Sequence, residues 1–194
     1  MAAQSTDAKI IAAFSDLALK YGYQGTTTKK IAETAGVNES TIFRHFKDKR
    51  TILERIINDY LDDVDQVGQN FQHSGDIVTD LQRVADIYNE FVQHHKVVFL
   101  VGVRESYQFP EVGKALQKLP VRFVSLVKNN FTKMQAEGEI RADIDTDSEA
   151  ANFVLMNFGN AVFTFSYQTA KMAIPMTSFK SENVQAFAAH LKTH

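Results

Sequence analysis

The stretch TTTKKIAETAGVNESTIFRHFKDK, residues 26–49, contains two short helical patterns separated only by Ala35-Gly36-Val37. Two helices that cross closely through a tight turn need a small residue on the first, a glycine in the turn and an apolar residue on the second. Ala32, Gly36 and Ile42 supply these residues in that order, and Val37 is an apolar residue that can fill the corner. The spacing predicts a helix-turn-helix.

Helical patterns cover nearly all of the rest of the chain. Three prolines and nine glycines interrupt 194 residues, and apolar side chains recur at helical spacing almost throughout. A first helix ends at Gly22, and Asp48 is expected to cap a long fourth helix. A capping box of Thr146 and Glu149 opens another helix. The other expected helices span residues 27–34, 38–46, 77–94, 95–107, 110–136 and 178–191, so the sequence predicts an all-α fold.

The composition excludes several classes of protein. Hydrophobic residues make up 44% and charged residues 23% of the chain, which is typical of a soluble globular protein. The chain has no cysteine, which excludes disulfides and thiolate chemistry. No apolar run approaches the roughly 20 residues that a membrane span needs, and the N-terminus lacks a signal-peptide pattern. We therefore expect a cytoplasmic chain.

Positive charge is concentrated near the N-terminus. Residues 1–60 carry nine Lys and Arg against seven Asp and Glu, a net charge of +2, whereas the remainder carries twelve against sixteen, a net charge of −4. Between Thr26 and Arg50, six basic residues stand against three acidic ones. Charge alone fits either a basic patch for an anionic partner or an ordinary solvated face.

The second helix of the motif has the character of a recognition helix, which reads bases in the major groove of DNA. In this helix, which begins at Asn38 and ends at His45 or Phe46, Ile42 and Phe46 are four residues apart and are expected to pack inward. The outward or flanking positions are then Glu39, Ser40, Phe43 and Arg44. Glu39 is suited to accept from a cytosine amino group, and Arg44 is suited to donate to guanine or to a phosphate.

Further candidates for DNA contact flank this helix. Thr27 and Thr28 open the preceding helix, where hydroxyls and backbone N–H groups suit a phosphate, and Lys29 follows them. Lys49 lies in the first turn of the fourth helix, where the helix dipole disfavours a cation, so we expect an external anion there. Each residue alone also fits a core position, a cap or a surface charge. Their occurrence together favours DNA binding.

Residues 10–57, IIAAFSDLALKYGYQGTTTKKIAETAGVNESTIFRHFKDKRTILERII, closely resemble the DNA-binding domain of TetR-family transcriptional regulators. The matching landmarks are an aliphatic-Phe helix ending in YGY, the TTT before IAETAGV, and STIFRHFKDK before an aliphatic helix. The resemblance implies DNA contacts for Thr28, Ser40, Thr41, His45 and Lys49. Phe43 stands where the family often has Tyr, so a hydroxyl contact is not available there, although packing against the sugar-phosphate edge remains.

The family architecture implies a domain organisation. Residues 1–50 would form a three-helix helix-turn-helix DNA-binding domain, joined by a long helix to a helical ligand-binding and dimerisation domain over residues 51–194. The last two long helices, about residues 146–170 and 178–192, would form a homodimer. A two-fold dimer presents two recognition helices to a palindromic operator. The alternative for these helices is intrachain core.

The C-terminal domain would hold a small, largely apolar effector. Apolar pockets are lined by aromatic side chains with a few polar groups. Arg104 lies among apolar neighbours in VFLVGVRESY and would need an anionic partner, either Glu90, Glu105 or an acidic ligand. The alternative is that these aromatic residues are core. The candidate lining residues are Tyr88, Phe91, His95, Phe99, Arg104, Tyr107, Phe123, Asn157 and Phe163.

The sequence therefore predicts a ligand-responsive, sequence-specific transcriptional regulator, most often a repressor in such families. Its partners would be double-stranded DNA, a small effector and a second copy of the chain, without a membrane. No cofactor or metal is expected, and no catalytic motif points to an enzyme. His94 and His95 are adjacent on a helix, which suits a metal badly. The alternative function is a helical carrier protein without useful DNA affinity.

Overall fold

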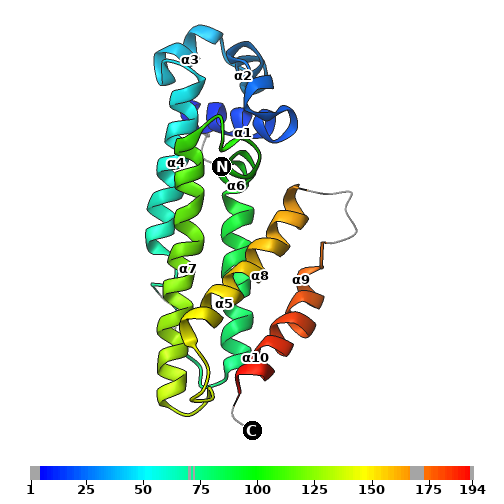
Figure 1. The fold of residues 1–194 in the computed structure, drawn as a ribbon. Helices are drawn as coiled ribbons and strands as arrows, with labels where there is room; N and C mark the ends of the chain where they lie inside the picture. The colour runs from blue at the N-terminus through cyan, green and yellow to red at the C-terminus, as the bar shows by residue number, and fades with distance from the viewer. Residues whose placement is uncertain (1–4, 70, 72, 167–172, 193–194) are drawn as a thin grey trace. The chain divides into compact units, whose positions relative to one another are not determined.

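A computed structural model describes residues 5–69, 71, 73–166 and 173–192, and this part of the chain is built from helices (Figure 1). It confirms the all-α fold class. A single antiparallel bridge joins Ile140 and Lys192. The elements are α1 (Thr6–Gly25), α2 (Thr28–Ala35), α3 (Glu39–Phe46), α4 (Lys49–Gln66), α5 (Ile77–His94), α6 (Lys96–Glu105), α7 (Pro110–Ala136), α8 (Thr146–Ser166), α9 (Met176–Ser178), the π-helix η1 (Phe179–Val184) and α10 (Gln185–Leu191).

The chain divides into two compact units. The first unit comprises Met1–Asp63 and Val97–Leu116, and the second comprises Val64–Lys96 and Gln117–His194. The boundary expected after residue 50, between a DNA-binding and a ligand-binding domain, stays a prediction. No helix in the described ranges is long and apolar enough to cross a membrane.

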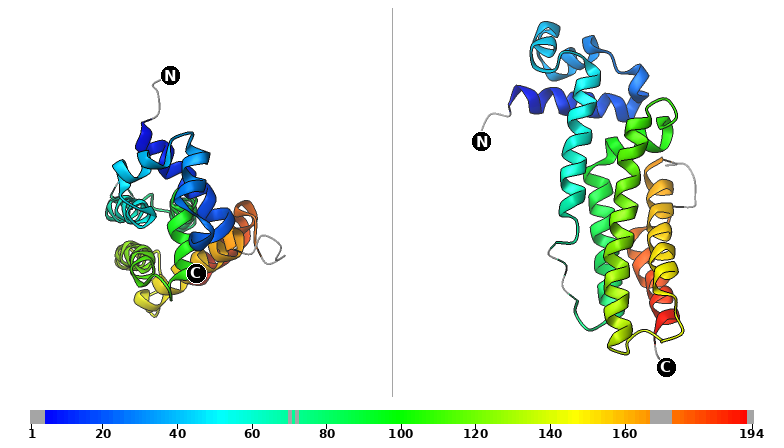
Figure 2. Two further views of the ribbon diagram at one scale, coloured as in Figure 1. Left: turned by 90° about the horizontal axis from the view of Figure 1, so that it is seen from above. Right: turned by 60° about the vertical axis from the view of Figure 1, so that its left-hand side comes forward.

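In the first unit, α2 and α3 lie on the same side of α1 (Figure 1 and the right-hand view of Figure 2). Helix α1 does not simply end at Gly22, as expected, but kinks there with φ 71° and continues to Gly25. An L residue would be strained at this φ, and an added Cβ would stand 3.1 Å from Glu105 Oε1. The buried side chains that hold these helices together include Ile10, Phe14, Ala18, Ile31, Ala32, Ile42 and Phe46.

The turn of the helix-turn-helix forms as the sequence predicts. Gly36 takes the left-handed conformation at φ 67°. Its backbone N–H donates to the carbonyls of Ala32 and Glu33. The N–H of Val37 then donates to the Ala32 carbonyl over 3.0 Å. This pattern closes the end of α2 and sets the start of α3. Asp48 caps α4 as expected, because its carboxylate accepts from the Thr51 N–H over 2.8 Å.

In the second unit, α8 and the η1–α10 segment each pack against α5 (Figure 1). Phe153, Phe179 and Val184 are among the fully buried residues of this unit. The helix expected over 146–170 is described as far as Ser166, and residues 167–170 lie outside the described part. The helix expected over 178–191 is a π-helical turn followed by an α-helix.

The capping of α8 differs from the expected Thr146–Glu149 box. The Asp145 carboxylate accepts from the Asp147 N–H at 3.1 Å and from the Ser148 hydroxyl at 2.6 Å. Asp145 therefore fills the capping role, because it stands at the N-cap position, whereas Thr146 is already the first residue of the helix.

Candidate nucleic-acid interface

Helix α3 divides into a buried face and an exposed face. Ile42 is fully buried and Phe46 is 5% exposed, which confirms that they pack inward. Phe43 points outward: although it is apolar, it is 52% exposed. Ser40 and Arg44 are also exposed. The outward face thus combines an aromatic ring with hydroxyl and guanidinium groups, which suits the edge of a DNA groove.

Two of the predicted DNA contacts bind each other. The Thr28 hydroxyl at the start of α2 donates to Glu39 Oε1 at the start of α3, over 2.5 Å. This bond holds the first turns of the two helices together. While it is formed, the hydroxyl proton of Thr28 is engaged within the protein, and Glu39 keeps its second carboxylate oxygen for an external donor.

Thr27, Lys29 and Lys30 at the start of α2 are exposed. Thr27 is the N-cap, and its hydroxyl oxygen accepts from the Lys30 N–H over 3.3 Å. Lys29 is exposed beside it. Lys30 folds back, and its Nζ donates to the Gly25 carbonyl at 3.1 Å. Lys29 is therefore the lysine of this turn that extends into solvent.

His45, at the C-terminal end of α3, contacts the N-terminal end of α1. Its Nδ1 lies 2.6 Å from Asp7 Oδ1. Thr41, one turn earlier, is half-buried. A DNA contact by His45 would thus use Nε2, because Nδ1 is occupied by Asp7.

Lys49 has an internal explanation that the sequence does not reveal. Its Nζ donates to the carbonyls of Tyr23 and Thr26, over 3.0 Å in each case. It also stands 4.3 Å from the centroid of the Tyr23 ring. Burial lowers the pKa of Lys49, against the opposing effect of Glu105. The cation at the start of α4 is stabilised by the carbonyls at the end of α1 and needs no external anion, and its third N–H remains for one.

The sequence reasoning missed the residues that surround Tyr23. The Tyr23 N–H donates to Glu105 Oε1 over 3.0 Å, and its ring meets Phe109 edge-on with centroids 4.5 Å apart. Arg50 Nη2 lies 3.5 Å from Glu111 Oε1. These contacts, all inside the first unit, join α1 and α4 to the end of α6 and the start of α7. A separation of 82 residues between Tyr23 and Glu105 leaves no local sequence signal.

Several predicted effector residues of the first unit do not fit a pocket wall. Tyr107 is 98% exposed, which corrects its assignment: α6 ends at Glu105, so Tyr107 lies in the turn beyond it. Arg104 is exposed too, so the argument from a buried charge does not apply to it. Phe99 is 1% exposed within α6.

The predicted effector residues of the second unit are mostly closely packed. Tyr88 and Phe123 meet edge-on with ring centroids 4.7 Å apart and are at most 2% exposed. The side-chain amide of Asn157 donates to the Phe153 carbonyl one turn earlier, over 2.8 Å. Phe163 is half-buried on α8. Core packing, the alternative raised from the sequence, describes Tyr88 and Phe123 in this structure.

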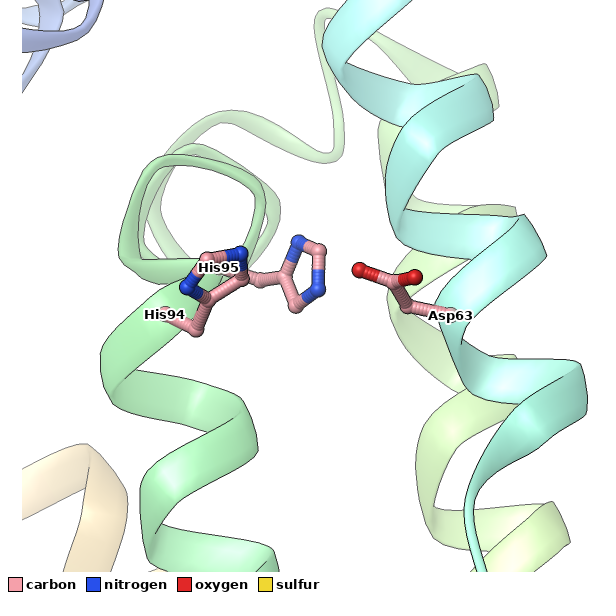
Figure 3. Close-up of side chains that lie close together, drawn as sticks. All are labelled: Asp63, His94 and His95. Atoms are coloured by element: carbon pink, nitrogen blue, oxygen red, sulfur yellow. The ribbon is translucent and has the colours of Figure 1, made fainter.

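The end of α5 carries the adjacent histidines (Figure 3). The rings of His94 and His95 meet edge-on, 4.8 Å between centroids, and Phe91 lies 4.5 Å from His95. Asp63, drawn in the same figure, belongs to α4. One ring nitrogen of His94 lies within 4.8 Å of one ring nitrogen of His95, so adjacency on the helix does not keep the two imidazoles apart as the sequence led us to expect.

A cleft of about 190 Å³ opens in the second unit at a place the sequence did not indicate. Asn160 and Thr164 of α8 and Asn89 of α5 supply its polar groups. Asn160 also accepts from the Ile174 N–H over 3.1 Å. The remaining lining residues are Ala173, Ile174, Pro175 and Met176.

A helix-turn-helix whose second helix has one buried apolar face and one exposed polar face is typical of DNA-binding regulators. The profile described as "Bacterial regulatory proteins, tetR family" matches residues 10–56, which span the helix-turn-helix and the start of α4. The chain is 26% identical over 182 residues to the uncharacterized HTH-type transcriptional regulator YvkB of Bacillus subtilis (strain 168), covering 94% of this chain and 95% of that protein.

Two more similar proteins carry functional names. The HTH-type transcriptional repressor KstR2 of Mycolicibacterium smegmatis is 25% identical over 138 residues, 65% of this chain and 63% of the repressor. The structure of the transcriptional regulator FadR from Bacillus subtilis, in complex with stearoyl-CoA, superimposes with a TM-score of 0.67 at 16% identity, covering 94% of this chain and 98% of FadR. The structural likeness concerns the fold.

Proposed function

We propose that this protein is a transcriptional repressor that binds a palindromic operator as a homodimer and leaves it when a small, largely apolar effector binds. The observation that carries the proposal is the exposed face of α3 in a helix-turn-helix of the TetR family. The similar KstR2 protein is named a transcriptional repressor, which supports repression over activation.

The residues proposed to contact DNA have different tasks. Arg44 and Ser40 reach base edges or phosphates, and Phe43 packs its exposed ring against the sugar-phosphate edge or a thymine methyl group. The α2 N-terminus holds a phosphate. The full proposed set is Thr27, Thr28, Lys29, Glu39, Ser40, Thr41, Phe43, Arg44, His45 and Lys49.

The homodimer is proposed to form through α8 and the segment from α9 to α10. Leu155 on α8 supports this, because its side chain is 64% exposed although it is large and apolar. Ala186 and Ala189 on α10 are exposed small residues that permit close approach of another helix. A two-fold axis through such an interface would place two α3 helices on successive half-sites.

The effector is proposed to act by a population shift. A ligand that binds one spacing of the two DNA-binding domains more tightly draws the dimer toward that spacing, and the operator is released if the spacing misfits it. The stearoyl-CoA in the FadR structure supports an apolar chain as the class of effector. We propose that the cleft lined by Asn89, Asn160 and Thr164 is where such a molecule begins to enter.

Selection from a random duplex library with the purified full-length protein tests the operator. We expect recovery of two inverted half-sites with centres about one helical turn apart or a multiple of it. Affinity for the recovered site should fall steeply with salt, because each neutralised phosphate releases counterions. Arg44→Ala should weaken binding at least ten-fold, whereas Lys133→Ala, an exposed lysine on α7, should leave it unchanged.

Each outcome decides a separate part of the proposal. No measurable binding even at low salt would favour the helical carrier protein instead. A selected site without two-fold symmetry would overturn the dimeric operator. Addition of stearoyl-CoA to the bound complex tests the effector class, and Thr164→Leu, which fills the cleft, should block release while leaving DNA affinity intact.

A further inference from the structure

Four ionisable side chains meet in the second unit, away from the DNA-binding helices. His73 lies in the segment before α5, and Glu137 and Glu139 lie in the turn after α7. The Nε2 atom of His73 is 3.1 Å from Glu139 Oε1 and 3.4 Å from Glu137 Oε2. Its other ring nitrogen, Nδ1, is 2.5 Å from Asp80 Oδ2. One imidazole therefore stands between three carboxylates.

Asp80 determines how the imidazole is oriented. It is 1% exposed, and both of its oxygens accept from the Ser74 N–H, at 3.1 and 3.0 Å. Because a buried carboxylate needs donors, the short contact to His73 requires a proton on Nδ1. In the neutral ring, Nε2 then presents its lone pair to Glu137 and Glu139.

Two carboxylates and a lone pair facing one another repel unless a cation lies between them. A proton on Nε2 is one such cation, but a single N–H can point at only one of the two glutamates. A divalent metal ion accepts all three groups at once. Among the residues that the structure describes, the ion-pair partner of Glu137 and of Glu139 is His73 in each case.

The spacing of the three groups matches a metal site. In a tetrahedral zinc site with bonds of about 2.0–2.1 Å, neighbouring ligand atoms lie roughly 3.3 Å apart. The two distances from Nε2, 3.1 and 3.4 Å, bracket this value. All three ligand atoms lie within 4.8 Å of one another. A ligating histidine whose other nitrogen donates to a carboxylate is also the usual arrangement around protein-bound metals.

We propose that His73, Glu137 and Glu139 bind a divalent transition-metal ion such as Zn²⁺, with Asp80 as a positioning residue. Imidazole and carboxylate ligands suit this class of ion. The ion would link the segment before α5 to the turn after α7, two segments more than 60 residues apart in sequence. Binding to the folded state alone would stabilise the protein by mass action.

Titration of the metal-free, tag-free full chain with Zn²⁺ tests the proposal. Calorimetry should give one equivalent per chain, with a rise in melting temperature. Glu137→Gln with Glu139→Gln preserves side-chain size and should weaken binding at least ten-fold. The control is His190→Asn, because His190 faces a single glutamate, Glu149, at 3.5 Å and should not contribute. Co²⁺ should give the visible absorption of a tetrahedral site in the wild type but not in the double variant.

Two results would overturn the inference. The absence of Zn²⁺ binding to the folded wild type would identify the cluster as a protonated histidine in an ion-pair network. Equal Zn²⁺ affinity in the wild type and the double variant would place the ion elsewhere. Both glutamates keep solvent access, with side chains 58% and 25% exposed, so the double variant is expected to fold, and circular dichroism checks this.

Discussion

The backbone N–H of Tyr23 donates to the carboxylate of Glu105 over 3.0 Å, which joins the end of α1 to the end of α6 within the first unit. The kink at Gly22 creates this contact, because it turns the Tyr23 N–H away from the preceding helical ladder. The bond thus attaches the helix-turn-helix to a helix that is distant in sequence.

Removal of this carboxylate should destabilise the first unit. Glu105→Ala leaves the Tyr23 N–H without its charged acceptor, and we expect a loss of about 1–2 kcal/mol in the free energy of unfolding. Urea denaturation measures the change. The matched control is Glu111→Ala, which breaks an exposed 3.5 Å ion pair with Arg50 and should change stability by less than about 0.5 kcal/mol. Equal effects of the two variants would contradict the role assigned to Glu105.

Lys49 should serve both stability and DNA binding. Lys49→Met removes the donor to the carbonyls of Tyr23 and Thr26, so we expect a loss of about 1–2 kcal/mol along with weaker operator binding. Lys29→Met, at an exposed position on α2, should weaken operator binding without lowering stability. Denaturation and salt-dependent anisotropy separate the two. A Lys49→Met protein as stable as the wild type would contradict the internal role of this cation.

Phe43 offers a test of the recognition surface. Its side chain is 52% exposed, so Phe43→Ala should hardly affect folding but should weaken operator binding by removing apolar contact. Phe43→Tyr adds a hydroxyl where the family often has one, and we expect several-fold tighter binding through a phosphate. Anisotropy against the selected operator measures both. If neither variant changes affinity, the ring lies outside the DNA contact.

Asp48 should make the stability of α4 depend on pH. Its pKa is lowered from 3.8, mainly because the Thr51 N–H hydrogen-bonds the carboxylate. Since the folded-state pKa is the lower one, the contribution is complete above the unfolded value of 3.8 and is lost as pH falls through the folded value. Asp48→Ala should cost about 1 kcal/mol at neutral pH and progressively less below about pH 4.

Thermal unfolding of the wild type and of Asp48→Ala between pH 3 and pH 7 measures this difference in stability. Asp62→Ala, which removes an exposed carboxylate from the C-terminal half of α4, is the control and should show no comparable pH dependence. A constant difference between Asp48→Ala and the wild type across the whole range would exclude the capping carboxylate as its source.

Local sequence patterns predicted the helix bounds well where the apolar periodicity agrees with the positions of helix-capping and helix-breaking residues. The expected ranges 77–94 and 110–136 match α5 and α7. Two boundaries differ from the expected ones: α1 kinks at Gly22 and continues to Gly25, and α6 ends at Glu105 instead of residue 107. Tyr107, which we expected to line a pocket, lies beyond the end of α6 and is 98% exposed.

The sequence by itself determined the helix-turn-helix, because a small residue, a glycine and an apolar residue at fixed spacing act within about ten residues of one another. It also determined the inward position of Ile42 and Phe46, which follows from helical periodicity. Only the tertiary structure decided that Lys49 binds the end of α1 and that His73 faces two glutamates. These features depend on tertiary contacts between segments that are distant in sequence, and the local spacing of residues does not specify such contacts.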